Sequence, residues 1–129
     1  MTRPFRFGVS VGDAPTRRAW TDKARRAEAL GYDTLLVADH LVDVLAPIPA
    51  LVAAADATTE VRVGSLVLAN DFRHPVLVAR EAATADLLTD GRFELGLGAG
   101  HMRSEYDEVG IEFASAGTRV GRLVVTDDR

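Results

Sequence analysis

The sequence contains no cysteine, which excludes disulfide bonds, thiolate nucleophiles and cysteine-ligated zinc or iron–sulfur centres. It also lacks any cluster of basic residues: the formal net charge is -4, and lysine and arginine are interspersed with aspartate and glutamate. We therefore expect no nucleic-acid or anionic-membrane partner. The N-terminus has no apolar signal segment, and the most apolar window, residues 45–55, is shorter than the ~20 residues of a membrane span. These absences favour a cytoplasmic protein.

The 129 residues, 47% of them hydrophobic, suffice for one globular domain. Four short runs rich in valine, leucine and phenylalanine predict buried strands at residues 5–10, 34–37, 62–68 and 93–97. These runs begin about 30 residues apart, close to the ~31 residues per βα unit of a barrel in which ~250 residues form eight units. The spacing predicts four consecutive βα units.

Helical patterns separate the predicted strands. The first begins after Thr16 as N-cap and stops at Gly31, and the second begins near Pro49 as a first-turn proline. The third begins at His74 and Pro75, and its predicted buried face comprises Val76, Ala79, Ala83 and Leu87. The alternating order predicts parallel strands with right-handed crossovers.

Two folds fit this order: an open doubly wound sheet, or part of a (β/α)8 barrel. A dinucleotide-binding sheet requires G-x-G-x-x-G after a strand, and residues 96–101 fail this pattern because His101 occupies the third glycine position. The fold class favoured is therefore α/β, a partial (β/α)8 barrel with about four parallel βα units.

All three histidines follow a predicted strand: His40 the second, His74 the third and His101 the fourth. In α/β folds the carboxyl ends of the strands form one edge, where functional residues collect. The histidines therefore indicate a site at this edge.

Three motifs at the same edge carry a family resemblance: VADHL at residues 37–41, LVLANDFRHP at residues 66–75 and GRFELGLGAG at residues 91–100. In this order and spacing the chain resembles the N-terminal half of the luciferase-like monooxygenase superfamily, most closely its deazaflavin (coenzyme F420)-dependent oxidoreductase branch. The resemblance covers about residues 5–123.

The resemblance implies an oxidoreductase in which the barrel mouth binds coenzyme F420, or alternatively FMN, and a hydride passes between the ring and a small organic substrate. It also implies that His40 is an acid/base beside the ring, a role suited to imidazole, which titrates near neutrality. Asp39 is expected either to orient His40 or to cap the following turn.

The resemblance further implies that cofactor contacts come from the third and fourth strand ends. A non-proline cis peptide is expected in the Ala69–Asn70 region, between Val67 and Asp71. Gly98 and Gly100 either let the backbone approach the cofactor or form a simple turn. His101 stands where the branch carries an aromatic residue. The expected cofactor-binding set is Val67, Leu68, Ala69, Asn70, Gly98, Gly100 and His101.

Four units are half of a complete barrel. We assign residues 1–123 to the N-terminal half of a luciferase-like barrel and residues 124–129 to a divergent tail, where no regular structure is expected. This indicates a truncated, frameshifted or deliberately shortened chain with impaired activity, which self-associates through its open barrel edges.

Two alternatives come from other classes. A non-catalytic half-barrel could act as an assembly partner. A metal-dependent hydrolase could ligate zinc through His40, His74 and His101, although the first strand lacks an H-x-H pair. The favoured interpretation has no metal site.

Overall fold

The computed structural model describes residues 4–127 and has one layer of parallel strands covered on one face by helices. The main sheet has the order β1-β2-β3-β5, formed by Gly8–Ser10, Thr34–Val37, Arg62–Ser65 and Phe93–Glu94. All its pairings are parallel, with Leu35 level with Val9 and Val63. A second parallel pair, β4 (Leu68–Ala69) and β6 (Leu97–Gly98), continues β3 and β5. This is the expected partial (β/α)8 barrel.

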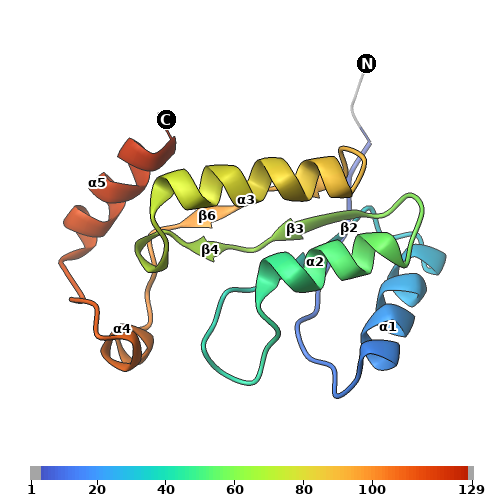
Figure 1. Cartoon of the computed structure of the whole chain (residues 1–129), viewed down its shortest axis with the longest axis horizontal. Helices are drawn as coiled ribbons and strands as arrows, with labels where there is room; N and C mark the ends of the chain where they lie inside the picture. The colour runs from blue at the N-terminus through green and yellow to red at the C-terminus, as the bar shows by residue number, and fades with distance from the viewer. Residues whose placement is uncertain (1–3, 128–129) are drawn as a thin grey trace.

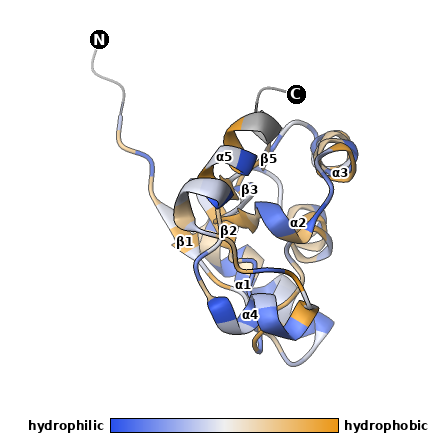
Figure 2. Cartoon of the chain, turned by 90° about the vertical axis from the view of Figure 1, so that its left-hand side faces the viewer, coloured by the Kyte–Doolittle hydropathy of each residue, from blue (hydrophilic) through white to orange (hydrophobic). Residues whose placement is uncertain are grey.

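Three helices cover one face of the sheet: α1 (Arg17–Ala29), α2 (Pro47–Asp56) and α3 (Pro75–Leu88). Figure 2 shows α2 and α3 on the same side of the strands. Alternate strand residues, including Leu35, Val63 and Phe93, face these helices because successive side chains of a strand point to opposite faces. The indole of Trp20 joins α1 to α2 by donating to the carbonyl of Ala50 at 2.8 Å. The core therefore lies between the sheet and its helices.

Two predicted strands are each interrupted. The run at residues 62–68 is split between β3 and β4, and the run at residues 93–97 between β5 and β6. The hydroxyl of Ser65 bridges the break: it donates to the carbonyl of Gly96 and accepts from its N–H, both at 2.9 Å. A Cβ at Gly96 would lie 2.3 Å from the Ser65 carbonyl oxygen, so only glycine fits there. Periodicity alone does not reveal such a break.

The observed helix boundaries agree with the predicted ones more closely than the observed buried faces do. Thr16 caps α1 by accepting from the N–H of Ala19 at 3.1 Å, as predicted, whereas α2 begins at Pro47 rather than near Pro49. The predicted buried face of α3 is wrong: the helix buries Val78 and Ala85 instead. The reason is that α3 carries apolar residues all round, so its sequence does not single out one stripe. The exposed members of the predicted set are Val76, Ala79, Ala83 and Leu87.

The chain after β6 forms α4 (Arg103–Val109) and α5 (Ala116–Asp127). Figure 1 shows them with β4 and β6 at one end of the molecule, opposite α1. Helix α5 continues through residues 124–127, where no regular structure was expected, and residues 128 and 129 lie outside the described part. Within residues 4–127, no helix has both the length and the apolar character that crossing a membrane requires.

At the opposite end of the sheet, Glu28 near the end of α1 holds the loop that leads into β3. Its carboxylate accepts the backbone N–H groups of Thr59, Glu60 and Val61, the last at 3.0 Å. Burial raises the pKa of Glu28, but the hydrogen bonds from Glu60, Val61 and Thr59 together lower it more, so the pKa lies below its ordinary value. The ionised carboxylate therefore stabilises the fold.

We predict that Glu28→Gln lowers the free energy of unfolding by about 1 kcal/mol at pH 7, because an amide oxygen replaces a charged acceptor. A depressed folded-state pKa contributes stability above the unfolded value near ~4.3, and that contribution is lost as pH falls through the folded value. Urea unfolding should therefore separate the variant from the wild type at pH 7, and the difference should shrink as the pH falls below the unfolded-state pKa. The exposed Glu81 of α3 supplies the control Glu81→Gln, and an equal effect there would contradict the assignment.

Candidate active site

A cavity of about 120 Å³ lies at the carboxyl ends of the strands. It brings together six of the residues that the sequence indicated: Asp39, His40, Val67, Ala69, Gly100 and His101. Three further residues complete the lining: Leu66, Phe72 and Glu105. The second, third and fourth βα units therefore converge at one place, where functional residues of such folds collect.

His40 follows β2 and is held by a buried carboxylate from α4. Its Nδ1 lies 2.9 Å from Glu105 Oε1, and the same oxygen accepts the backbone N–H of Leu41 at 2.9 Å. The side chain of Glu105 is 7% exposed and that of His40 is 31% exposed. A carboxylate at Nδ1 selects the tautomer that carries its proton there, which leaves Nε2 as the nitrogen that can exchange a proton.

Asp39 does not take the His40-orienting role suggested for it; Glu105 contacts His40 instead. The Asp39 carboxylate accepts the backbone N–H of Ala69 at 2.9 Å and forms a two-point ion pair with the guanidinium of Arg73. It is buried, so these bonds compensate the loss of water around its charge. Asp39 thus ties the end of β2 to β4 and to the residues that follow η1, the 3-10 helix Asn70–Phe72.

The non-proline cis peptide is present, but its expected position was wrong. It joins Leu66 to Val67, one bond before the expected interval of residues 67–71. Leu66 and Val67 are 51% and 37% exposed and both line the cavity. The cavity lining in this part of the chain therefore begins at Leu66, one residue before the first member of the expected cofactor-binding set.

Both candidate glycines are required by packing inside the chain. A Cβ at Gly98 would lie 2.3 Å from Val67 Cγ2, and one at Gly100, whose φ is +78°, would lie 2.2 Å from Tyr106 Oη. Gly100 lines the cavity and Gly98 does not. Leu68 and Asn70 are buried and also lie outside the lining. These positions therefore support the cavity wall.

An aromatic cluster fixes α4, and with it Glu105. The ring of Tyr106 packs 5.2 Å from Phe72 and 4.9 Å from Phe113, centroid to centroid, and Arg119 lies 4.0 Å above Phe113. The Tyr106 hydroxyl lies 3.2 Å from Asp71 Oδ2. Burial, and then the charge of Asp71, raises the pKa of Tyr106 above its ordinary value. The phenol therefore stays neutral and can donate to that carboxylate.

The three histidines do not form a metal centre. His101 lies beside His40 in the cavity, but His74 caps α3 by accepting the N–H of Val76 at 3.2 Å. Within the described part of the chain, no group of three or more histidine, aspartate or glutamate side chains is arranged to hold a metal ion. The zinc alternative thus lacks its third ligand.

Glu105 is a charged site residue that the sequence alone does not single out. Charged residues are rarely buried without a partner, and the partner here lies 65 positions away in the sequence. The available signal was its position: an acid beside an aromatic residue, Tyr106, in the first helix after the last predicted strand.

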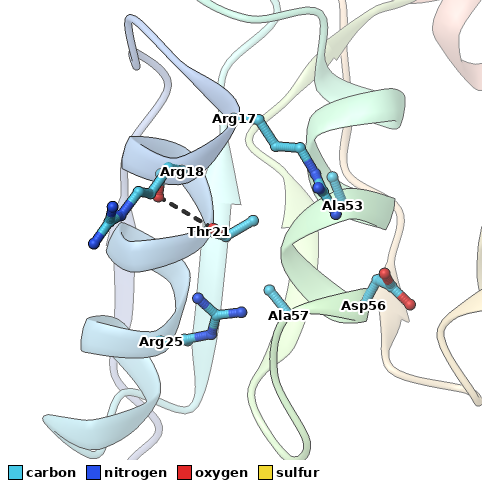
Figure 3. A pocket seen from close by; sticks show the side chains of 7 residues that line it. All are labelled: Arg17, Arg18, Thr21, Arg25, Ala53, Asp56 and Ala57. Carbon is cyan, nitrogen blue, oxygen red and sulfur yellow. Dashed lines mark hydrogen bonds between the residues drawn. The ribbon is translucent and has the colours of Figure 1, made fainter.

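A separate groove of about 440 Å³ runs between α1 and α2 in the helical layer. Figure 3 shows Arg17, Thr21 and Arg25 along α1 facing Ala53 of α2 and Ala57, the C-cap of that helix. None of its lining residues belongs to the strand ends, so this groove is distinct from the cavity at His40.

The chain is similar in sequence to several known oxidoreductases and monooxygenases. The chain is 33% identical over 115 residues to a 4-hydroxyprotoasukamycin monooxygenase of Streptomyces nodosus subsp. asukaensis, covering 84% of the chain and 31% of that protein. It is 34% identical over 117 residues to an F420-dependent glucose-6-phosphate dehydrogenase of Amycolatopsis mediterranei, covering 82% and 34%. It is also 34% identical over 72 residues, 54% of the chain and 20% of the relative, to the oxygenase component of a flavin-dependent trigonelline monooxygenase of Acinetobacter baylyi.

Among solved structures, the coenzyme F420-dependent tetrahydromethanopterin reductase of Methanopyrus kandleri superposes with a TM-score of 0.74 at 25% identity, covering 84% of the chain and 30% of that structure. The chain spans about a third of the length of the curated relatives it matches. The family of luciferase-like monooxygenases matches residues 1–123. The chain therefore belongs to the luciferase-like monooxygenase family.

Proposed function

We propose that this chain supplies the His40 side of a cofactor site in an oxidoreductase that transfers a hydride between coenzyme F420 and a small organic substrate. The observation that carries the proposal is the imidazole of His40, held at Nδ1 by buried Glu105 inside the cavity at the strand ends. FMN is the alternative cofactor. The F420-dependent dehydrogenase relative and the F420-dependent reductase structure favour F420, and the flavin-dependent trigonelline monooxygenase relative supports a flavin.

The residues of the cavity fit a flat heteroaromatic ring. Leu66 and Val67 offer adjoining exposed apolar side chains, and His40 offers a proton-transfer group beside them. The enclosed volume of about 120 Å³ is below the ~300–1,000 Å³ of typical ligand pockets. The described residues therefore form one wall of such a site.

When bound, a deazaflavin or flavin ring accepts or donates a hydride. In the direction of alcohol oxidation, His40 Nε2 accepts the hydroxyl proton of the substrate as the hydride leaves the adjacent carbon. Glu105 stabilises the imidazolium that forms and keeps the ring oriented, while Leu66 and Val67 exclude water from one side. The reverse direction returns the proton from Nε2 to the substrate oxygen.

We also propose a cytoplasmic location, in keeping with the cysteine-free composition.

A second candidate function is assembly, because β1 and β5 are the outer strands of the four-stranded sheet. Unpaired strand edges are templates for pairing with another chain. Leu95, directly after β5, is 42% exposed beside one edge. We propose that a second copy of the chain pairs with these edges.

The pairing of His40 with Glu105 predicts a specific NMR signature in the cofactor-free chain. In wild-type protein the Nδ1–H of His40 is protected by its bond to Glu105 and gives a slowly exchanging, downfield imidazole signal. Glu105→Ala should abolish this signal and mobilise the ring. Glu108→Ala, an exposed position on the same helix, is the control. Persistence of the signal in Glu105→Ala would show that another group holds His40.

Titration of the purified chain with F420 and with FMN tests the cofactor proposal. Because the described residues form one wall of the site, we expect specific binding weaker than micromolar, with little or no turnover. His40→Ala should reduce any residual turnover by about 10²-fold, the range of general acid–base catalysis. Micromolar binding with efficient turnover would contradict the impaired activity, and the absence of specific binding of either cofactor would contradict the cofactor site.

Size-exclusion chromatography with light scattering tests the assembly proposal. We expect a mass of twice 13.8 kDa for the wild-type chain. Leu95→Lys should shift the protein toward monomer, because a charge beside the β5 edge opposes strand pairing. The control Leu87→Lys changes a leucine that is more accessible, at 77% exposure, but lies on α3. A wild-type monomer at all concentrations would overturn this proposal.

A further inference from the structure

The cavity holds a second imidazole, which the mechanism above does not use. The rings of His40 and His101 lie 5.6 Å apart, centroid to centroid, with an angle of 84° between their planes. His40 follows β2 and His101 follows β6, so the parallel strands bring together two groups 61 positions apart in the sequence. Both side chains line the same cavity.

Exposure to solvent increases along Glu105, His40 and His101. The side chain of Glu105 is 7% exposed, that of His40 is 31% exposed, and His101 lies on the surface. The three residues form a continuous line from a buried carboxylate to solvent, because Glu105 contacts His40 and His40 contacts His101. A proton at His40 thus has a titratable neighbour on its solvent side.

The other ionisable groups of the cavity are already engaged. Glu105 accepts hydrogen bonds from His40 and from the backbone of Leu41, and Asp39 is paired with Arg73 and with the N–H of Ala69. Both carboxylates are buried. His101 is therefore the exposed titratable side chain of the cavity lining.

We propose that His101 is a proton shuttle that connects His40 Nε2 with solvent. The proposal rests on the acid/base role of His40 and deepens it, because an acid/base must return to its starting protonation state in every cycle. The rings meet edge to face with their centroids 5.6 Å apart, so one water molecule beside them can link a nitrogen of each ring. His40 Nε2 releases one proton, one nitrogen of His101 accepts it, and the other nitrogen releases one to water. Only protons are transferred, and no group is oxidised or reduced in this step.

Proton exchange in the cofactor-free chain tests the shuttle independently of turnover. The measurement is the exchange of the His40 Nε2–H with water, followed by ¹⁵N-edited NMR in weakly acidic buffer, where imidazolium is populated. We expect His101→Phe to slow this exchange about tenfold, since phenylalanine keeps an aromatic ring beside His40 but cannot carry a proton. His101→Glu, which can carry one, should restore exchange toward the wild-type rate.

The matched control is His74→Asn, which changes the third histidine and keeps an acceptor at the N-cap of α3. It should leave exchange at His40 unchanged, and the melting temperatures of all variants should agree. Equal exchange in wild type and His101→Phe, or failure of His101→Glu to restore it, would overturn the shuttle. If exchange is slower in His101→Phe but the chain binds neither F420 nor FMN, the result would support the shuttle and count against the proposed function.

Discussion

The hydrogen bond between the Glu105 carboxylate and Nδ1 of His40 is the constraint on which the site depends. It joins the second βα unit to the helix that follows the last strand, and the same oxygen accepts the N–H of Leu41. Without that bond Glu105 would be a buried charge with one backbone donor, an arrangement that costs several kcal/mol. The packing of Tyr106 between Phe72 and Phe113 holds α4 where this bond can form.

The charged and titratable side chains at the two ends of the sheet have different roles. At the amino ends of the strands, Glu94 pairs with Arg6 and Arg62, and Glu28 holds three backbone N–H groups. These contacts join segments of the chain to one another and stabilise the fold. At the carboxyl ends, buried Asp39 likewise joins two segments of the chain, whereas His40 Nε2 is left for proton exchange and His101 reaches solvent. This division matches the barrel pattern of stability at one face and chemistry at the other.

The sequence was most informative where a signal is local. Strand spacing, the Thr16 cap and the placement of His40 at a strand end were all predictable, because each follows from a short pattern. The break between β3 and β4 was not predictable from periodicity, since it depends on Ser65 bonding to Gly96 in the neighbouring strand. The contact of Glu105, rather than Asp39, with His40 was missed for the same reason: the partner of each carboxylate lies 30 or more positions away in the sequence.

The cavity at His40 is the proposed ring side of a cofactor site. Amide chemical-shift mapping of the ¹⁵N-labelled chain during addition of F420 tests it most directly, because it locates binding even when affinity is low. We expect perturbations concentrated at Leu41, Val67, Gly100 and His101, which lie in or beside the cavity. Perturbations confined to the groove lined by Arg17 and Arg25, or scattered over the surface, would contradict it.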